Sequence, residues 1–196
     1  MIVTVVNVKG GVAKTTTAMA LATAASRDGL DTRVLDGDPQ ATATAWWQMA
    51  GDNGEDLPFE VSPTNRAHVS RIGRTAGDGV TIVDCPPNGD LVDASIKAAD
   101  FVVIPSTPAP VDLQQTILTA ATCEDAGKPC AVLIVMARTG TVSLKTFRET
   151  VGRDFHVFDT EIPLKEDVKF DFGHRFRSNL YGYEDVWREI KREVNA

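Results

Sequence analysis

Residues 9–16 read Lys9-Gly10-Gly11-Val12-Ala13-Lys14-Thr15-Thr16. An apolar run rich in β-branched residues precedes this stretch at 2–8, and an Ala- and Thr-rich segment of helical character follows at 15–28. Strand, glycine turn and helix in this order form the setting in which backbone N–H groups and a helix N-terminus enclose phosphate oxygens. The sequence therefore predicts a phosphate-binding loop at 9–16, lined by the backbone of all eight residues.

Individual side chains of this loop have distinct expected roles. Lys14 would reach the terminal phosphates of a bound nucleotide, and the Thr15 hydroxyl would ligate the magnesium ion that bridges them. Thr16 adds a further phosphate hydrogen bond. The ordinary pattern G-x-x-x-x-G-K-[ST] is not met, because Val8 and Ala13 stand where its glycines would be. The alternative is a Gly-Gly turn flanked by two solvated lysines.

Two acidic segments follow apolar strands further along the chain. Asp36 and Asp38 end the run at 32–35, and side-chain alternation sends both carboxylates beyond the end of the strand in similar directions, so that a metal or a water can lie between them. Asp84 ends the apolar run at 80–83, as expected for a carboxylate that holds magnesium through its water shell. An Asp-Gly turn is the plainer alternative at 36–37.

Strand and helix patterns alternate along the whole chain. The expected strands are 2–8, 32–35, 59–61, 80–83, 101–104, 131–136 and 156–158, and the expected helices are 15–28, 41–50, 65–74, 91–99, 111–126 and 141–153. This order predicts an α/β fold with one doubly wound, mainly parallel sheet flanked by helices, as a single domain over 1–196. Ligands of such sheets bind beyond the carboxyl ends of the strands, where the loops at 9–15, 36–40, 84–90 and 104–110 should gather.

Composition excludes several other classes. The net charge is −7, with 43% hydrophobic and 24% charged residues, which is ordinary for a globular protein. The three cysteines have no C-x-x-C spacing, so zinc and redox sites have no support. No apolar run reaches the roughly 18 residues of a membrane span, and the N-terminus lacks the basic flank of a signal peptide. We expect a cytoplasmic protein.

The loop matches the deviant pattern K-G-G-x-x-K-[ST] and so resembles the ParA/MinD family of ATPases. Residues 36–40 resemble that family's D-x-D-P-Q segment, 80–87 its Walker B segment, and 104–113 a stretch typical of small, ParF-like plasmid partition proteins. The resemblance implies a slow ATPase that uses ATP and Mg²⁺ and forms a homodimer with ATP between the subunits. Lys9 would cross to the partner's nucleotide, Asp38 would align the attacking water, and Asp36 and Asp84 would support the magnesium.

The resemblance also implies where the adenine lies. A loop with an Ile-Pro pair borders the base in this family, so Pro163 and Leu164 are candidate contacts, and Arg138 is a candidate to stack from the preceding loop.

Basic residues gather in the later part of the chain and predict a surface for sequence-independent DNA binding, with scattered solvated charges as the equal alternative. These residues are Lys128, Arg138, Lys145, Arg148, Arg153, Lys165, Lys169, Arg175 and Arg177.

By this resemblance, the function is ATP-dependent DNA partition: the dimer binds nucleoid DNA, and a ParB-like adaptor bound at a centromere stimulates hydrolysis. One alternative keeps the ATPase but gives it another cargo, such as a protein cluster or microcompartment. Others are an iron-sulfur carrier or reductase of the nitrogenase iron-protein type, with cluster cysteines from both subunits, and a nucleotide switch without turnover.

The C-terminal segment has apolar residues four positions apart, Val186, Ile190 and Val194. This helical stripe predicts packing on the core and not membrane binding.

Overall fold

The computed structural model describes residues 1–72 and 79–195 and is built around a six-stranded sheet. The strand order is β3-β2-β4-β1-β5-β6, and every pairing between neighbours is parallel. The strands are β1 (Ile2–Val5), β2 (Thr32–Asp36), β3 (Glu60–Pro63), β4 (Val80–Asp84), β5 (Phe101–Ser106) and β6 (Cys130–Ile134). The predicted α/β fold with a parallel sheet is confirmed, and β1 lies at its centre between β4 and β5.

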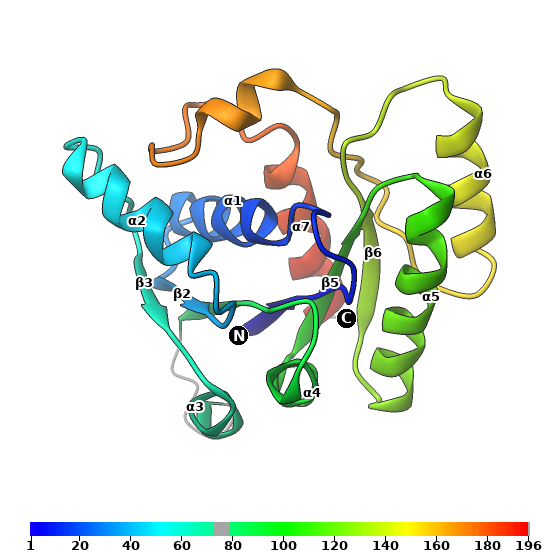
Figure 1. The fold of residues 1–196 in the computed structure, drawn as a ribbon, viewed down its shortest axis with the longest axis horizontal. Coiled ribbons are helices and arrows are strands. Elements are labelled where there is room, and N and C mark those ends of the chain that lie inside the picture. Colours follow the sequence, from blue (N-terminus) through cyan, green and yellow to red (C-terminus); the bar gives the residue numbers. More distant parts are fainter. Residues whose placement is uncertain (73–78, 196) are drawn as a thin grey trace.

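Helices cover both faces of this sheet (Figure 1). They are α1 (Lys14–Arg27), α2 (Thr42–Asp52), α3 (Arg66–Ile72), α4 (Asp90–Ala98), α5 (Pro110–Asp125), α6 (Val142–Val151) and α7 (Tyr183–Val194), with a 3-10 turn η1 (Glu166–Phe170). One core layer joins α1, α2 and α7 to the sheet, and the other joins α3, α4, α5 and α6. Because both faces are covered, the central strands β1, β4 and β5 are buried along their whole length.

Side-chain alternation assigns each strand residue to one of the two layers. Val3 and Val5 of β1 belong to the layer under α1, and Ile2 belongs to the opposite layer. Helix α1 lies flat on the sheet because its inner positions are small, and residues 17–25 are all buried. In α7, Val186 and Ile190 are fully buried, so the prediction that this stripe packs on the core is confirmed. Burial of each such aliphatic side chain contributes about 1.5–3 kcal/mol.

The predicted strand at 156–158 is wrong. Val157 forms only an isolated bridge with Val132 of the edge strand β6. The chain then turns away, because the carboxylate of Glu189 on α7 accepts hydrogen bonds from the backbone N–H groups of Asp159 (2.8 Å) and Thr160 (3.0 Å). Pairing with β6 is interrupted at this anchor, which depends on a residue about 30 positions away in the sequence, and it resumes at Ile162, whose N–H donates to the oxygen of Ile134 (2.9 Å).

Several predicted boundaries also differ by a few residues. The run at 2–8 is a strand only to Val5, after which Asn7 is tied by its side chain to the backbone oxygen of Pro105 (2.9 Å) and the chain enters the glycine loop. The helix predicted at 65–74 spans Arg66–Ile72, and its predicted last residues, 73 and 74, lie outside the described part of the chain. None of the helices within 1–72 and 79–195 has the length and apolar character needed to cross a membrane.

Candidate nucleotide-binding site

A cavity of about 520 Å³ opens beyond the carboxyl ends of β1, β2 and β4. Three loops line it, and each follows one of these strands. The lining residues are Gly10, Gly11, Ala13, Lys14, Thr15, Thr16, Asp38, Pro39, Gln40, Pro86, Pro87 and Asn88. The loops expected to gather after the first, second and fourth strands therefore meet at one site, as parallel strands require.

The glycine loop places the N-terminus of α1 at this cavity. Ala13 is the N-cap of α1 in a left-handed conformation (φ 58°, ψ 32°), and no side chain caps the helix. The first amides of a helix have no partner within the helix, so those of the first turn of α1 are free to donate to an anion. Gly11 also has a positive φ of 78°, which explains why a glycine is needed there.

Lys14 is already drawn into the loop. Its side chain is buried, and its Nζ donates a 2.9 Å hydrogen bond to the backbone oxygen of Lys9. Burial lowers the pKa of Lys14, and the negative charges of Asp84 and Asp38 partly offset this effect. An ammonium group with a single carbonyl partner retains donors for phosphate oxygens.

Asp84 is the most unusual charged group at the site. Its carboxylate is buried at the end of β4, and neither oxygen has a hydrogen-bond partner of good geometry within the described residues. Burial raises the pKa of Asp84 to about 7, and the nearby Thr15 hydroxyl and Lys14 ammonium counteract part of this rise. A buried carboxylate without a partner is costly unless a cation compensates it. This group and the Thr15 hydroxyl are oxygen donors that suit magnesium.

The two carboxylates of the 36–38 segment do different things. Asp36 is buried, and its Oδ2 accepts hydrogen bonds from the backbone N–H (2.8 Å) and hydroxyl (2.7 Å) of Thr44 in α2. Asp36 is thus used to fix the loop, and it does not line the cavity. Asp38 does line it, with its Oδ1 accepting from the backbone N–H of Gln40 at 2.9 Å. Of the pair, only Asp38 faces the space where a nucleotide would lie.

Two residues that organise these loops were not singled out from the sequence. Thr44 holds Asp36 across eight positions, and Gly37 donates its backbone N–H to the oxygen of Asp84 at 2.9 Å. A Cβ at Gly37 would lie 3.0 Å from that oxygen and 2.3 Å from Leu91 Cδ2, so a side chain there would push the loops apart. In the sequence, Gly37 is marked only by its place between two aspartates at the end of a strand, and this pattern is equally typical of an ordinary turn.

The predicted adenine contacts come together at a different place. Ala137 forms a parallel β-bridge with Pro163. The N–H of Ala137 donates to the oxygen of Ile162, and the N–H of Leu164 donates to the oxygen of Ala137, both at 2.9 Å. Arg138 and Leu164 are both exposed. Arg138 lines a second cavity of about 360 Å³ beside the 107–110 loop. Arg138, Pro163 and Leu164 do not line the cavity of the glycine loop.

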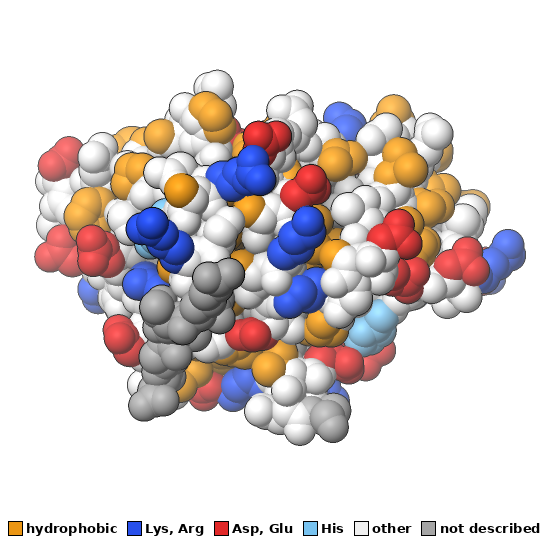
Figure 2. Space-filling view, turned by 90° about the horizontal axis from the view of Figure 1, so that it is seen from below, with side chains coloured by type: hydrophobic (Ala, Val, Ile, Leu, Met, Phe, Trp, Pro, Cys, Tyr) orange, Lys and Arg blue, Asp and Glu red, His pale blue; other side chains and the backbone are white. Residues whose placement is uncertain are grey.

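Many of the basic residues predicted to bind DNA have local partners. Lys145 pairs with Glu149 (3.8 Å), and Arg148 pairs with Glu161 (2.9 Å). Lys169 and Arg175 are likewise held, by Glu166 and by the 55–56 segment respectively. Figure 2 shows the same mixing of acidic and basic side chains on the face that carries α3 and α4. Four of the nine predicted residues are thus held by contacts within the chain, and DNA binding by this group stays a prediction.

The cysteines do not suit a cluster shared between subunits. Cys85 and Cys123 are buried and Cys130 is half-buried. Burial raises the pKa of the Cys85 thiol to about 12, so the thiol stays protonated at neutral pH. Within 1–72 and 79–195, no group of three or more His, Cys, Asp or Glu side chains could hold a metal ion. A cluster shared between subunits needs surface thiolates from each subunit, and Cys85 and Cys123 are buried in the described chain.

Comparisons with known proteins agree with this geometry. The family model described as the CobQ/CobB/MinD/ParA nucleotide binding domain matches residues 3–174. A maintenance of carboxysome distribution protein A of Gloeobacter kilaueensis is 41% identical over 123 residues, which are 60% of this chain and 54% of that protein. The protein ParA of Rhizobium radiobacter is 34% identical over 113 residues, 57% of this chain and 50% of that protein. The chain thus spans about half the length of these curated relatives.

The fold has close counterparts among solved structures. A putative plasmid partition protein of Borrelia burgdorferi bound to AMPPNP superimposes with a TM-score of 0.76 and 17% sequence identity. The match covers 98% of each chain. At this level of identity the likeness establishes the shared fold.

Proposed function

This chain belongs to the CobQ/CobB/MinD/ParA family of nucleotide-binding domains, and from that premise we propose that it is a slow, ParA-type ATPase that positions a cargo inside the cell. ATP binding switches it into a dimer, and hydrolysis returns it to the monomer. The curated relatives named above support this, since their names concern the distribution of carboxysomes and the ParA type.

One observation carries the ATPase proposal: Asp84, a buried carboxylate without a hydrogen-bond partner among the described residues, lies at the foot of a glycine loop, and no described side chain caps the helix that follows. A triphosphate accepts hydrogen bonds from the free amides of α1 and replaces the backbone oxygen of Lys9 as the partner of the Lys14 ammonium. Thr15 and Asp84 hold the magnesium ion, which neutralises phosphate charge when bound. Asp38 orients the attacking water from the facing loop. Asp36 supports this arrangement through the loop that it fixes.

The remaining predicted contacts complete the proposal. Pro163 and Leu164 border the adenine and Arg138 stacks beside it, with base recognition mainly through backbone groups. Lys9 reaches the nucleotide of the partner subunit. The dimer associates with DNA without sequence preference, and we place the protein in the cytoplasm and on the nucleoid when ATP is bound.

For the cargo, two candidates have specific support. The identity to the carboxysome distribution protein exceeds that to ParA, 41% against 34%, so we place a protein cluster or microcompartment first. Plasmid DNA with a ParB-like adaptor comes second. The test is made in the native host, with a fluorescent fusion of the chain and with either cargo labelled. When the Asp38→Ala variant replaces the wild-type chain, the true cargo loses its regular spacing and the other does not.

The test of the catalytic proposal is ATP turnover by the purified protein with DNA and magnesium. We expect slow release of phosphate in the wild type and none above background in Asp38→Ala, which still binds ATP. Dimer formation with ATP but no phosphate release in the wild type would instead show a switch without turnover. Equal turnover by the two proteins would contradict the role of Asp38.

A further inference from the structure

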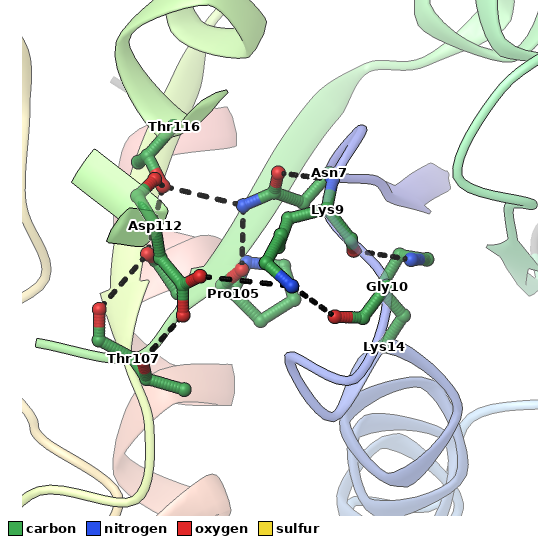
Figure 3. A network of polar contacts seen from close by, with 9 residues as sticks. Asn7, Lys9, Gly10, Lys14, Pro105, Thr107, Asp112 and Thr116 are labelled. Atoms are coloured by element: carbon green, nitrogen blue, oxygen red, sulfur yellow. Dashed lines mark hydrogen bonds and ion pairs between the residues drawn. The ribbon is translucent and has the colours of Figure 1, made fainter. Parts of the chain in front are cut away.

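Lys9 and Asp112 lie next to each other, although they come from different parts of the chain. Lys9 follows β1 at the start of the glycine loop, and Asp112 lies in the first turn of α5. The Lys9 Nζ is 3.9 Å from Oδ1 of Asp112 and donates a 3.4 Å hydrogen bond to the backbone oxygen of Gly10. Figure 3 shows the lysine side chain directed toward the aspartate. Lys9 does not line the cavity of its own chain.

Asp112 is held firmly and yet is incompletely paired. Its side chain is 8% exposed, whereas that of Lys9 is 38% exposed. Oδ2 accepts a 2.5 Å hydrogen bond from the hydroxyl of Thr107, while Oδ1 has no hydrogen-bond partner among the described residues. A buried carboxylate oxygen in this state gains from any nearby cation. The Lys9 ammonium is the cation that the structure places beside it.

A buried polar network fixes the two backbones relative to each other (Figure 3). The side chain of Asn7 accepts from the N–H of Lys9 (2.9 Å) and donates to the oxygen of Pro105 (2.9 Å) and to the hydroxyl of Thr116 (3.3 Å). Thr116 in turn donates to the backbone oxygen of Asp112 at 2.9 Å. The backbone entering the glycine loop is therefore rigid against α5, and only the flexible stem of Lys9 is free to move.

From this arrangement we propose that Asp112 is a positioning residue for Lys9: it holds the ammonium on the α5 side in the nucleotide-free chain and releases it when the subunits close on ATP. The inference rests on the proposed function, in which Lys9 serves the partner's nucleotide. The pair is long and the lysine is partly exposed, so the attraction is weak enough to be exchanged. A triphosphate carries several negative charges and outcompetes one carboxylate.

The consequence is that Asp112 opposes dimer closure. Every closure breaks two such pairs, one in each subunit, and leaves two buried carboxylates without a cation. Asp112→Asn keeps the shape of the side chain and removes the charge. Exposed ion pairs contribute modestly, and two of them correspond to roughly a 2- to 30-fold change in an equilibrium constant.

The experiment measures dimer formation by sedimentation velocity with magnesium and AMPPNP in wild type, Asp112→Asn and two controls. We expect Asp112→Asn to dimerise at roughly 2- to 30-fold lower protein concentration than wild type. Asp185→Asn removes a carboxylate from the exposed pair with Arg188 on α7 and should behave as wild type. Thr107→Val disturbs the same pocket but keeps the charge of Asp112, and it should not tighten the dimer.

A second measurement reports on the monomer alone. In nucleotide-free protein, acetylation of lysines followed by mass spectrometry should modify Lys9 roughly 1.5- to 5-fold faster in Asp112→Asn than in wild type. Lys145, which pairs with Glu149, is the internal reference.

The outcomes separate the two proposals. A wild-type chain that stays monomeric with AMPPNP would refute the proposed function and, with it, this inference. A wild-type dimer together with unchanged or weaker dimerisation of Asp112→Asn would overturn this inference alone. Unchanged reactivity of Lys9 would overturn it as well, because the pair would then not restrain the ammonium.

Discussion

The phosphate end and the adenine end of the proposed site are built in different ways. At the phosphate end, the groups are backbone amides and buried side chains such as Lys14 and Asp84, each placed by a strand end or a helix start. At the adenine end, Leu164 is 44% exposed and Arg138 is exposed on a loop. In the proposed site, the triphosphate would therefore bind to groups fixed by strands and helices, and the base would bind to exposed side chains on loops.

Removing the buried cation at the phosphate end should have the largest effect. Lys14→Ala takes away the ammonium that would contact the terminal phosphates in the proposed site, and loss of one such charge-stabilising group costs about 10²- to 10³-fold in kcat. The loss of kcat is measured by steady-state phosphate release, and circular dichroism checks that the variant is folded. A decrease below tenfold would show that the loop does not stabilise the reacting phosphates.

Removing the buried anion should have opposite effects on activity and on stability. Asp84→Asn weakens magnesium binding and slows turnover, but it also removes the cost of an ionised buried group. The raised pKa of about 7 means that folded Asp84 keeps its proton between about pH 4 and 7 while the unfolded chain has lost it. The stability of the metal-free wild type therefore falls as pH rises through this range.

This contrast is measured by urea unfolding in EDTA at pH 5 and pH 8. The Asp84→Asn variant should be more stable than wild type at pH 8, by at most about 4 kcal/mol, and the gap should be smaller at pH 5. A variant that is less stable than wild type at pH 8 would mean that the carboxylate has a partner in the metal-free protein.

Changes at the adenine end should be smaller. Leu164→Ala removes an exposed side chain that would cover part of the base, so the KM for ATP should rise by less than about tenfold while kcat stays close to wild type. Arg138→Ala should act similarly. A loss as large as that of Lys14→Ala would reverse the comparison and place a critical contact at this end.

The smallest effect concerns the backbone of the phosphate loop. Ala13 has a left-handed conformation that costs a residue with a Cβ about 1–2 kcal/mol. Ala13→Gly relieves this but adds entropy to the unfolded chain, so we expect stabilisation within about 1 kcal/mol. Ala121→Gly, inside α5, is the control and should destabilise by about 1 kcal/mol. A clear loss of stability in Ala13→Gly would count against strain at this position.

A contrast between local patterns and contacts of distant segments explains how much of the fold and site the sequence could predict. The glycine loop and the acids at strand ends are local patterns, and they predicted the parallel sheet, the positions of Lys14, Asp38 and Asp84, and three of the loops that line the cavity, whereas the loop expected there at 104–110 does not line it. The failures involve contacts between distant segments. Glu189 on α7 accepts hydrogen bonds from the backbone N–H groups of Asp159 and Thr160 and so interrupts the strand expected at 156–158.

Charge surfaces were also beyond local patterns. Lys145 and Arg148 read as part of a basic run in the sequence, but Arg148 is paired with Glu161, thirteen positions later, which only the folded chain brings near. The Lys9–Asp112 pair is a further case, since its members are about 100 positions apart. A single sequence does not reveal such pairs, because nothing in the local spacing marks them.

The most direct test of the account is isothermal titration calorimetry of the purified protein with AMPPNP at several magnesium concentrations, in wild type and in Asp84→Asn. We predict saturable heat in the wild type, with an affinity that increases with magnesium, and a clearly weaker magnesium dependence of the affinity in the variant. Absence of saturable heat in the wild type, or the same magnesium dependence in both proteins, would contradict the claim that the glycine loop and Asp84 form one nucleotide site.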